Sequence, residues 1–256
     1  MNDIQKSAIE RVLIDCLRKK FRTYKPETKH MPFHTRLLGK DRMALFSFIH
    51  SLNTVFGTSI FEPVAQQMGS ASFQSASTHQ KLDNKISAKA QEVIQNIIDQ
   101  LNTASIRPNK PDEIKAIRSA CRVGEMKSVK LTVVDLKLVS HSGDTYLIDI
   151  KSAKPNIGEF KGFKRTLLEW VAAFLATDPK ANVHTLLAMP YNPYEPLPYS
   201  RWTMAGMIDL KQEIKVANEF WDFVGGDGAY DELLNVFETV GIAMRSEIDD
   251  HFATFK

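Results

Sequence analysis

Two short apolar runs each enclose an acidic side chain. Asp135 lies within VVDLKLV at 133–139, and Asp149 lies within YLIDIK at 146–151, two residues before Lys151. Side chains alternate between the faces of a strand, so Asp149 and Lys151 share a face if this run is extended. A carboxylate in an apolar run is costly unless it is paired or binds a cation. The pattern therefore predicts that these two acids belong to a functional site.

The segment between the two runs, SHSGD at 140–144, is rich in turn-forming residues. A hairpin centred on Ser142 would set Asp135 directly opposite Asp149, with their Cβ atoms about 4.5–5.5 Å apart. Two carboxylates at that distance repel each other unless a cation lies between them. The expectation depends on a turn of odd length, because a shift by one residue would place Ile148 or Ile150 opposite Asp135 instead.

A pair of close carboxylates suits Mg²⁺, which is usually held by one or two acids together with waters and phosphate oxygens. Such an ion stabilises charge on a phosphate under attack and lowers the pKa of a bound water, while Lys151 would position that water or neutralise the transition state. The predicted chemistry is hydrolysis of a phosphodiester. The ordinary alternative is an exposed hairpin whose Asp135, Asp149 and Lys151 only face solvent.

A basic helical stretch follows the second run, and cations just beyond such a site indicate contact with a polyanion. The net charge is only +3, from 33 basic and 30 acidic residues, so this contact must be a local patch. The residues that we expect to contact DNA backbone or bases are Lys154, Asn156, Lys161, Lys164 and Arg165.

These residues resemble the PD-(D/E)XK nuclease superfamily, whose core motif is an acid on one strand and (D/E)-x-K on the next. Asp135 matches the first position, and Asp149, Ile150 and Lys151 match the second, while Val134 replaces the nominal proline. The order of strand, hairpin, strand and helix is also similar, over about residues 110–190. The resemblance implies an α/β fold with a central mixed sheet flanked by helices.

Three longer stretches are similar to Type II restriction endonucleases, in particular to a group that cuts the palindrome GGNCC. They are MPFHTRLLGKDRMALFSFIHSLNT, DIKSAKPNIGEFKGFKRTLLEW and WDFVGGDGAYDELLNVF. The resemblance implies a Mg²⁺-dependent enzyme that cuts double-stranded DNA. It also implies a homodimer, because each active site cuts one strand of a two-fold symmetric target.

Superfamily members often carry a further acid on a helix before the first strand. The candidates are Glu92, on an expected helix at 86–102, and Glu125. An ordinary surface position accounts for each of them, and we assign neither to the site.

Two other functions fit the same core. A repair or junction-resolving nuclease would cut by DNA structure and ignore sequence. A non-catalytic DNA-binding protein built on a nuclease fold would lack one member of the set formed by Asp135, Asp149 and Lys151, and all of them are present.

The length and composition of the chain are compatible with an enzyme domain, but they do not identify its activity. The 256 residues, 43% of them hydrophobic, suffice for a single domain over 1–256. Two cysteines, Cys16 and Cys121, are too few for a disulfide framework and favour a reduced cytosol. There is no signal-peptide pattern or long apolar run, so we expect neither export nor membrane spanning. Walker and Rossmann glycine loops are also missing, so no nucleotide cofactor is expected.

Periodicity predicts the elements around the hairpin. We expect a helical N-terminal part at 1–105, the catalytic core at about 110–190 and a helical C-terminal part at 206–256. Residues 69–83 lack periodicity and are expected to be a loop. The segment 190–202 contains four prolines and should be irregular, with Tyr191, Tyr194, Arg201 and Trp202 either contacting DNA or holding the loop in place. Helices are predicted at 3–21, 40–55 and 86–102, from Phe163 to Phe174, and on both sides of Gly225, Gly226 and Gly228, with a buried strand at 182–189.

Overall fold

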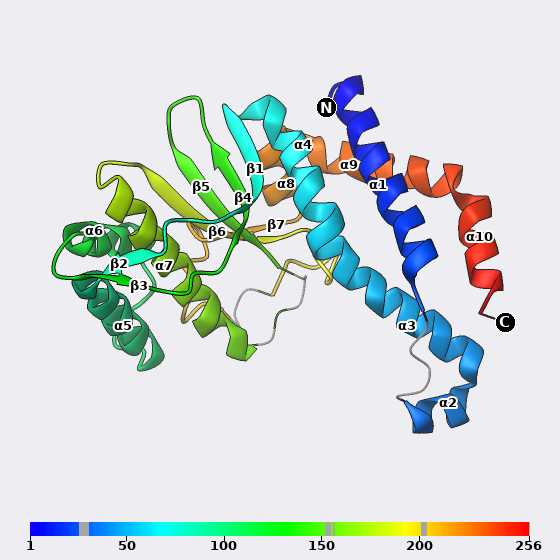
Figure 1. Ribbon diagram of the computed structural model, residues 1–256, viewed down its shortest axis with the longest axis horizontal. Helices are drawn as coiled ribbons and strands as arrows, with labels where there is room; N and C mark the ends of the chain where they lie inside the picture. The colour runs from blue at the N-terminus through cyan, green and yellow to red at the C-terminus, as the bar shows by residue number, and fades with distance from the viewer. Residues whose placement is uncertain (26–30, 152–154, 156, 201–203, 256) are drawn as a thin grey trace.

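A computed structural model describes residues 1–25, 31–151, 155, 157–200 and 204–255. Within these residues, five strands form one mixed sheet in the order β1-β4-β5-β6-β7 (Figure 1). Neighbours β1, β4 and β5 are antiparallel, whereas β5, β6 and β7 are parallel. The strands are β1 (Ser75–Gln80), β4 (Val134–Val139), β5 (Thr145–Ile150), β6 (Val183–Met189) and β7 (Ile214–Val216), and a separate ladder joins β2 (Lys85–Ser87) to β3 (Met126–Ser128).

Helices cover both faces of this sheet. One face carries α5 (Ala88–Asn102), α6 (Lys110–Ala120) and α7 (Phe160–Thr177), with a short 3-10 helix at Ile157–Glu159 before α7. The other face carries α1 (Asp3–Thr23), α4 (Glu62–Ser72), α8 (Asn218–Gly225) and α9 (Ala229–Ala243). Beside that face lie α2 (Pro32–Leu38), α3 (Lys40–Val55), a π-helix (Phe56–Phe61) and α10 (Arg245–Ala253).

The burial of each strand follows its place in the sheet. Along β4, buried residues alternate with half-buried ones, whereas β5 is buried at every position except Tyr146 because helices cover both of its faces. Leu147 joins the core beneath α7, and Ile148 joins the core beneath α4 and α8. The sheet thus separates two hydrophobic cores, and its central strand contributes to both.

An arm built from α2 and α3 extends away from the sheet (Figure 1). Phe48 of α3 ties the arm to the rest of the chain, because its ring lies against Phe21 of α1 and Phe252 of α10 at centroid distances of 6.0 and 5.4 Å. Several other large apolar side chains of the arm are exposed. They are Phe33, Leu37, Leu38, Leu45, Phe46 and Ile49.

Most of the predicted elements are confirmed, including the helices at 3–21, 40–55 and 86–102, and the mixed sheet flanked by helices. The loop expected at 69–83 is wrong. There α4 continues to Ser72, and Ser75–Gln80 form β1, which pairs with β4 at the sheet edge. The sheet therefore extends beyond 110–190, since β1 and β7 come from the parts expected to be helical. The C-terminal part also gains a further helix, α10.

In the part of the chain that the structure describes, no single helix is long and apolar enough to cross a membrane. Taken together, the two helices Lys40–Val55 and Ser59–Ser72 are long and apolar enough, but they are bent relative to each other by 50°, and the match rests on length and composition alone.

Gly69 sets the distance between α4 and the sheet. A Cβ atom at this position would lie 2.8 Å from Leu138 Cδ2 on β4 and 3.2 Å from Ala76 Cβ on β1. We predict that Gly69→Ala lowers the free energy of unfolding by about 1–3 kcal/mol, because the added methyl overpacks this contact. Urea unfolding followed by circular dichroism measures the change.

The matched control is Gly241→Ala on α9, where an added Cβ meets no heavy atom within 4 Å. This substitution should leave stability unchanged or raise it by up to about 1 kcal/mol, because alanine favours helix. Equal stability of the two variants would show that α4 does not need the close approach.

Candidate active site

The hairpin of β4 and β5 has the predicted register. Its pairs run from Val139 opposite Thr145 to Leu136 opposite Ile148, and are centred on Ser142. Extending this register by one residue would set Asp135 opposite Asp149. The turn is closed by the Ser140 N–H, which donates to Asp144 O at 2.9 Å, and Gly143 adopts a φ of +92° that favours glycine.

Asp135, Asp149 and Lys151 are brought together at the end of this hairpin. Asp135 Oδ2 accepts a hydrogen bond from the Ile150 N–H at 2.8 Å. Asp149 is only 2% exposed, and the Lys151 ammonium lies 2.6 Å from its Oδ1. Burial, and next the charge of Asp149, raise the pKa of Asp135 well above its ordinary value. The two acids therefore interact strongly across the strand pair.

A third carboxylate, Glu62, reaches the same place from the first turn of α4. It is 3% exposed, and its pKa is raised to about 7, mainly by burial and then by the charge of Asp149, against the opposing effect of Lys151. The sequence analysis missed this residue. Glu62 shares the signal that identified Asp135, an acid within an apolar run (IFEPVA), but no local pattern links it to the hairpin.

The two glutamates considered from the sequence lie elsewhere. The side chain of Glu92 is 68% exposed and contacts Lys89, and that of Glu125 is 77% exposed. Both are ordinary surface glutamates.

The chemistry of the site fits a hard divalent cation. Glu62 Oε2 and Asp149 Oδ1 are buried oxygens that accept no hydrogen bond of normal geometry from the described residues, although the Lys151 ammonium lies 2.6 Å from Asp149 Oδ1 and the His79 imidazole 3.3 Å from Glu62 Oε2. Across those residues, no group of three or more His, Cys, Asp or Glu side chains is arranged to hold a metal ion by itself. A pair of carboxylates still fits Mg²⁺, since this ion keeps waters and phosphate oxygens among its ligands.

Comparison with known proteins identifies the family. A family model described as Type II restriction endonuclease, HinfI, matches residues 1–241. The chain belongs to this family of Type II restriction endonucleases.

Curated relatives agree with this assignment. Type II restriction enzyme HgiCII of Herpetosiphon aurantiacus is 28% identical over 223 residues, which cover 85% of this chain and 80% of the relative. Type II restriction enzyme MjaII of Methanocaldococcus jannaschii is 25% identical, with 98% of this chain and 75% of the relative covered. Type II restriction enzymes are site-specific deoxyribonucleases, so this chain is an enzyme that acts on DNA.

The residues expected to contact DNA differ in where they lie in this restriction endonuclease. Lys154 and Asn156 lie outside the described residues, as do Arg201 and Trp202. Lys161 is exposed in the first turn of α7. Arg165 is half-buried and donates to Gln95 Oε1 at 2.6 Å, which orients its guanidinium along α5.

Lys164 was expected to contact DNA, and this expectation is wrong. Its side chain is 0% exposed, and its ammonium lies 2.6 Å from both Glu113 Oε2 on α6 and Glu213 Oε2 before β7. Lys110 joins the same cluster at 2.8 Å from Glu213 Oε1. The ammonium of Lys164 is therefore paired with buried carboxylates inside the protein. These ion pairs link α7 to α6 and to the segment before β7.

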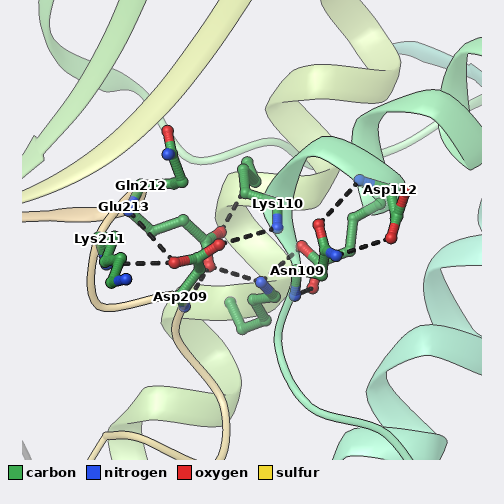
Figure 2. Close-up of polar contacts among 9 residues, drawn as sticks. Asn109, Lys110, Asp112, Asp209, Lys211, Gln212 and Glu213 are labelled. Atoms are coloured by element: carbon green, nitrogen blue, oxygen red, sulfur yellow. Dashed lines mark hydrogen bonds and ion pairs between the residues drawn. The ribbon is translucent and has the colours of Figure 1, made fainter.

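Backbone groups complete this cluster (Figure 2). The Asp209 N–H donates to Glu213 Oε2 at 2.8 Å, and the Lys110 N–H donates to Asp209 Oδ2 at 3.2 Å. Asn109 caps α6 by accepting from the Asp112 N–H at 3.2 Å. The loop before β7 is thus fastened to the start of α6 and, through Lys164, to α7.

A largely apolar cleft of about 690 Å³ opens beside Lys151. The π-helix, α8, α9 and the segment after β6 line it. Tyr191 is among the lining residues, so this part of the irregular segment faces the site. Lys151 therefore stands between the buried carboxylates and open space, where a substrate can reach its ammonium. The aromatic lining residues are Phe56, Phe61, Tyr191, Trp221, Tyr230 and Phe237.

The buried cluster gives a stability prediction. Lys164→Met should lower the free energy of unfolding by about 3–5 kcal/mol, because it leaves Glu113 and Glu213 buried with too little positive charge. Lys161→Met on the same helix should change stability by less than about 0.5 kcal/mol, because Lys161 is exposed. Chemical unfolding of both variants tests this, and a similarly small loss for Lys164→Met would contradict the structural role.

Proposed function

We propose that this restriction endonuclease is Mg²⁺-dependent and has a PD-(D/E)XK active site formed by Asp135, Asp149 and Lys151. The observation that carries the proposal is the hairpin register, whose last pair, Leu136 with Ile148, immediately precedes Asp135 and Asp149 along the two strands. The ammonium of Lys151 at 2.6 Å from Asp149 supports it further. Glu62 is proposed as an additional acid of the site because its pKa responds to Asp149 and Lys151.

Each residue has a distinct task in this mechanism. Mg²⁺, when bound, supplies positive charge to the scissile phosphate and makes a water more acidic. Asp135 and Asp149 provide carboxylate oxygens for it, and the Ile150 N–H holds Asp135 in place. Lys151 donates to the attacking water or to a phosphate oxygen as charge develops there. Water oxygen adds to phosphorus, one P–O bond to the sugar breaks, and the departing oxygen takes up a proton.

We propose that the target is a short palindrome of the GGNCC type, because the three longer stretches resemble enzymes with that target. Lys161 and Arg165, together with Lys154 and Asn156, are proposed to contact DNA, since they follow the active-site strand and precede or begin α7. Family membership favours this function over a structure-specific repair nuclease and over a non-catalytic DNA-binding protein.

A homodimer is proposed as the working form, because a palindrome presents two equivalent strands to two equivalent sites. The exposed apolar side chains of α2 and α3 support this proposal. Phe33 and Leu37 are 84% and 83% exposed and lie one turn apart on α2. Contiguous exposed apolar groups of this kind mark interaction surfaces.

The catalytic proposal predicts that Asp149→Asn slows cleavage of plasmid DNA in Mg²⁺ by at least about 100-fold, because it removes a charge at the reacting centre. Gel electrophoresis follows the rate, and sequencing the fragment ends reports the target and the cut position. Wild-type enzyme should give discrete fragments with identical ends.

The controls are Glu92→Gln and Glu125→Gln, which also remove one negative charge each but at exposed positions. Both should cut as the wild type does. Unchanged cutting by Asp149→Asn would remove this residue from the mechanism, and cutting without discrete ends would contradict a specific target.

The dimer proposal predicts that the double substitution of Phe33→Asp and Leu37→Asp shifts the protein from dimer to monomer, because like charges replace the apolar contact. Sedimentation velocity measures the mass. Ile4→Asp is the control, since Ile4 is 82% exposed on α1, away from the arm. A dimer that persists in the double variant places the interface elsewhere.

A further inference from the structure

The backbone of His79 departs from the strand that contains it. His79 belongs to the edge strand β1, yet its φ is +52°, in the left-handed region that side chains other than glycine rarely adopt. Its neighbours Thr78 and Gln80 still pair with Leu136 and Val134 on β4. By this register, His79 lies opposite Asp135, so the strained residue stands beside the proposed active site.

The imidazole of His79 contacts the third carboxylate. Its Nδ1 lies 3.3 Å from Glu62 Oε2, a buried oxygen that accepts no hydrogen bond of normal geometry within the described chain, so the imidazole is a close polar neighbour of this oxygen. A left-handed φ inside a strand changes the direction of the side chain relative to simple alternation. The unusual conformation therefore accompanies the contact with Glu62.

Packing does not explain this conformation. The side chain of His79 is 62% exposed, so little apolar burial offsets the backbone strain. An edge strand has solvent on one side, so other side chains could be accommodated at this position without the unusual backbone conformation. The backbone strain at His79 is not required by packing, and it lies next to the proposed reacting centre. Strain of this kind indicates a functional constraint.

We propose that His79 is a positioning residue that orients the Glu62 carboxylate toward Asp149 and Lys151. Nδ1, when it carries hydrogen, attracts Glu62 Oε2 across 3.3 Å and so favours one rotamer of this side chain. The inference rests on the proposed function, because it assigns a task at the same site. His79 does not touch the reacting atoms in this arrangement.

The test compares substitutions that separate strain from function. His79→Gly removes both the strain and the imidazole. We expect its melting temperature to be unchanged or higher, while the cleavage rate at saturating DNA and Mg²⁺ falls roughly 10- to 100-fold, as for other residues that orient an active-site ligand. DNA affinity measured by fluorescence anisotropy without Mg²⁺ should stay within about twofold of the wild type, a span of under 0.5 kcal/mol.

His79→Asn is the rescue variant, because asparagine tolerates a left-handed backbone and offers an amide donor. It should recover most of the cleavage rate. Ala104→Gly is the matched control, since Ala104 has a φ of +53° in the turn after α5 and is exposed. It relieves the same kind of strain and should leave cleavage unchanged.

A double-substitution cycle tests whether His79 acts through Glu62. In a Glu62→Gln background, His79→Gly should cause little further loss of rate, because the carboxylate that it orients is already changed. Independent losses that multiply would overturn the proposal. So would a His79→Gly variant that cuts at the wild-type rate, or one whose melting temperature falls in parallel with its activity.

These outcomes are distinct from failure of the proposed function. If Asp149→Asn cuts normally, the active site itself is misassigned, whatever His79 does. If Asp149→Asn is inactive and His79→Gly is fully active, only the role of His79 is overturned.

Discussion

Carboxylates held close together and away from water are the constraint on which this site depends. Burial and mutual repulsion raise the pKa values of Asp135 and Glu62, so the ionised forms are disfavoured in the folded protein. Lys151 and the Ile150 N–H offset only part of this cost. A divalent cation would relieve the remainder, which is why an arrangement that is unfavourable for folding suits a site for phosphodiester hydrolysis.

Such repulsion must be opposed by rigid supports on both sides of the sheet. On one side, α7 is fastened by Lys164 to carboxylates from α6 and from the segment before β7. On the other side, α4 approaches the sheet closely at Gly69 and delivers Glu62 from its first turn. Lys151 lies between these supports, with its ammonium 5.1 Å from the centre of the Phe163 ring on α7. The carboxylates of the site are therefore carried by regular elements, which hold geometry better than loops do, while Lys151 directly follows β5.

Local patterns were sufficient to predict the hairpin. Turn-forming residues between the two apolar runs predicted a hairpin centred on Ser142, and the pairs from Val139 with Thr145 to Leu136 with Ile148 have that centre. The β1 strand was not predictable in the same way. Its sequence, SASTHQ, has little apolar content, and it is extended because β4 offers it an edge to pair with. Strand formation there depends on tertiary context more than on composition.

Long-range partners explain the other differences. Lys164 has the sequence appearance of a surface cation, and its burial depends on glutamates that are far away along the chain. Glu62 is distant in sequence from the hairpin that it joins. The surroundings of both side chains depend on contacts between segments that are far apart in the sequence. The periodicity of a single sequence does not predict such contacts.

The arm and the third carboxylate belong to consecutive helical segments, which bend by 50° between Lys40–Val55 and Ser59–Ser72. Residues of α3 lead directly into the π-helix at Phe56–Phe61, and α4 begins with Glu62 immediately afterwards. A π-helix is a rare and adjustable piece of backbone that often occurs near functional sites. The covalent path from the arm to Glu62 therefore runs through this bend, so the place of that acid depends on the backbone of the π-helix just before it.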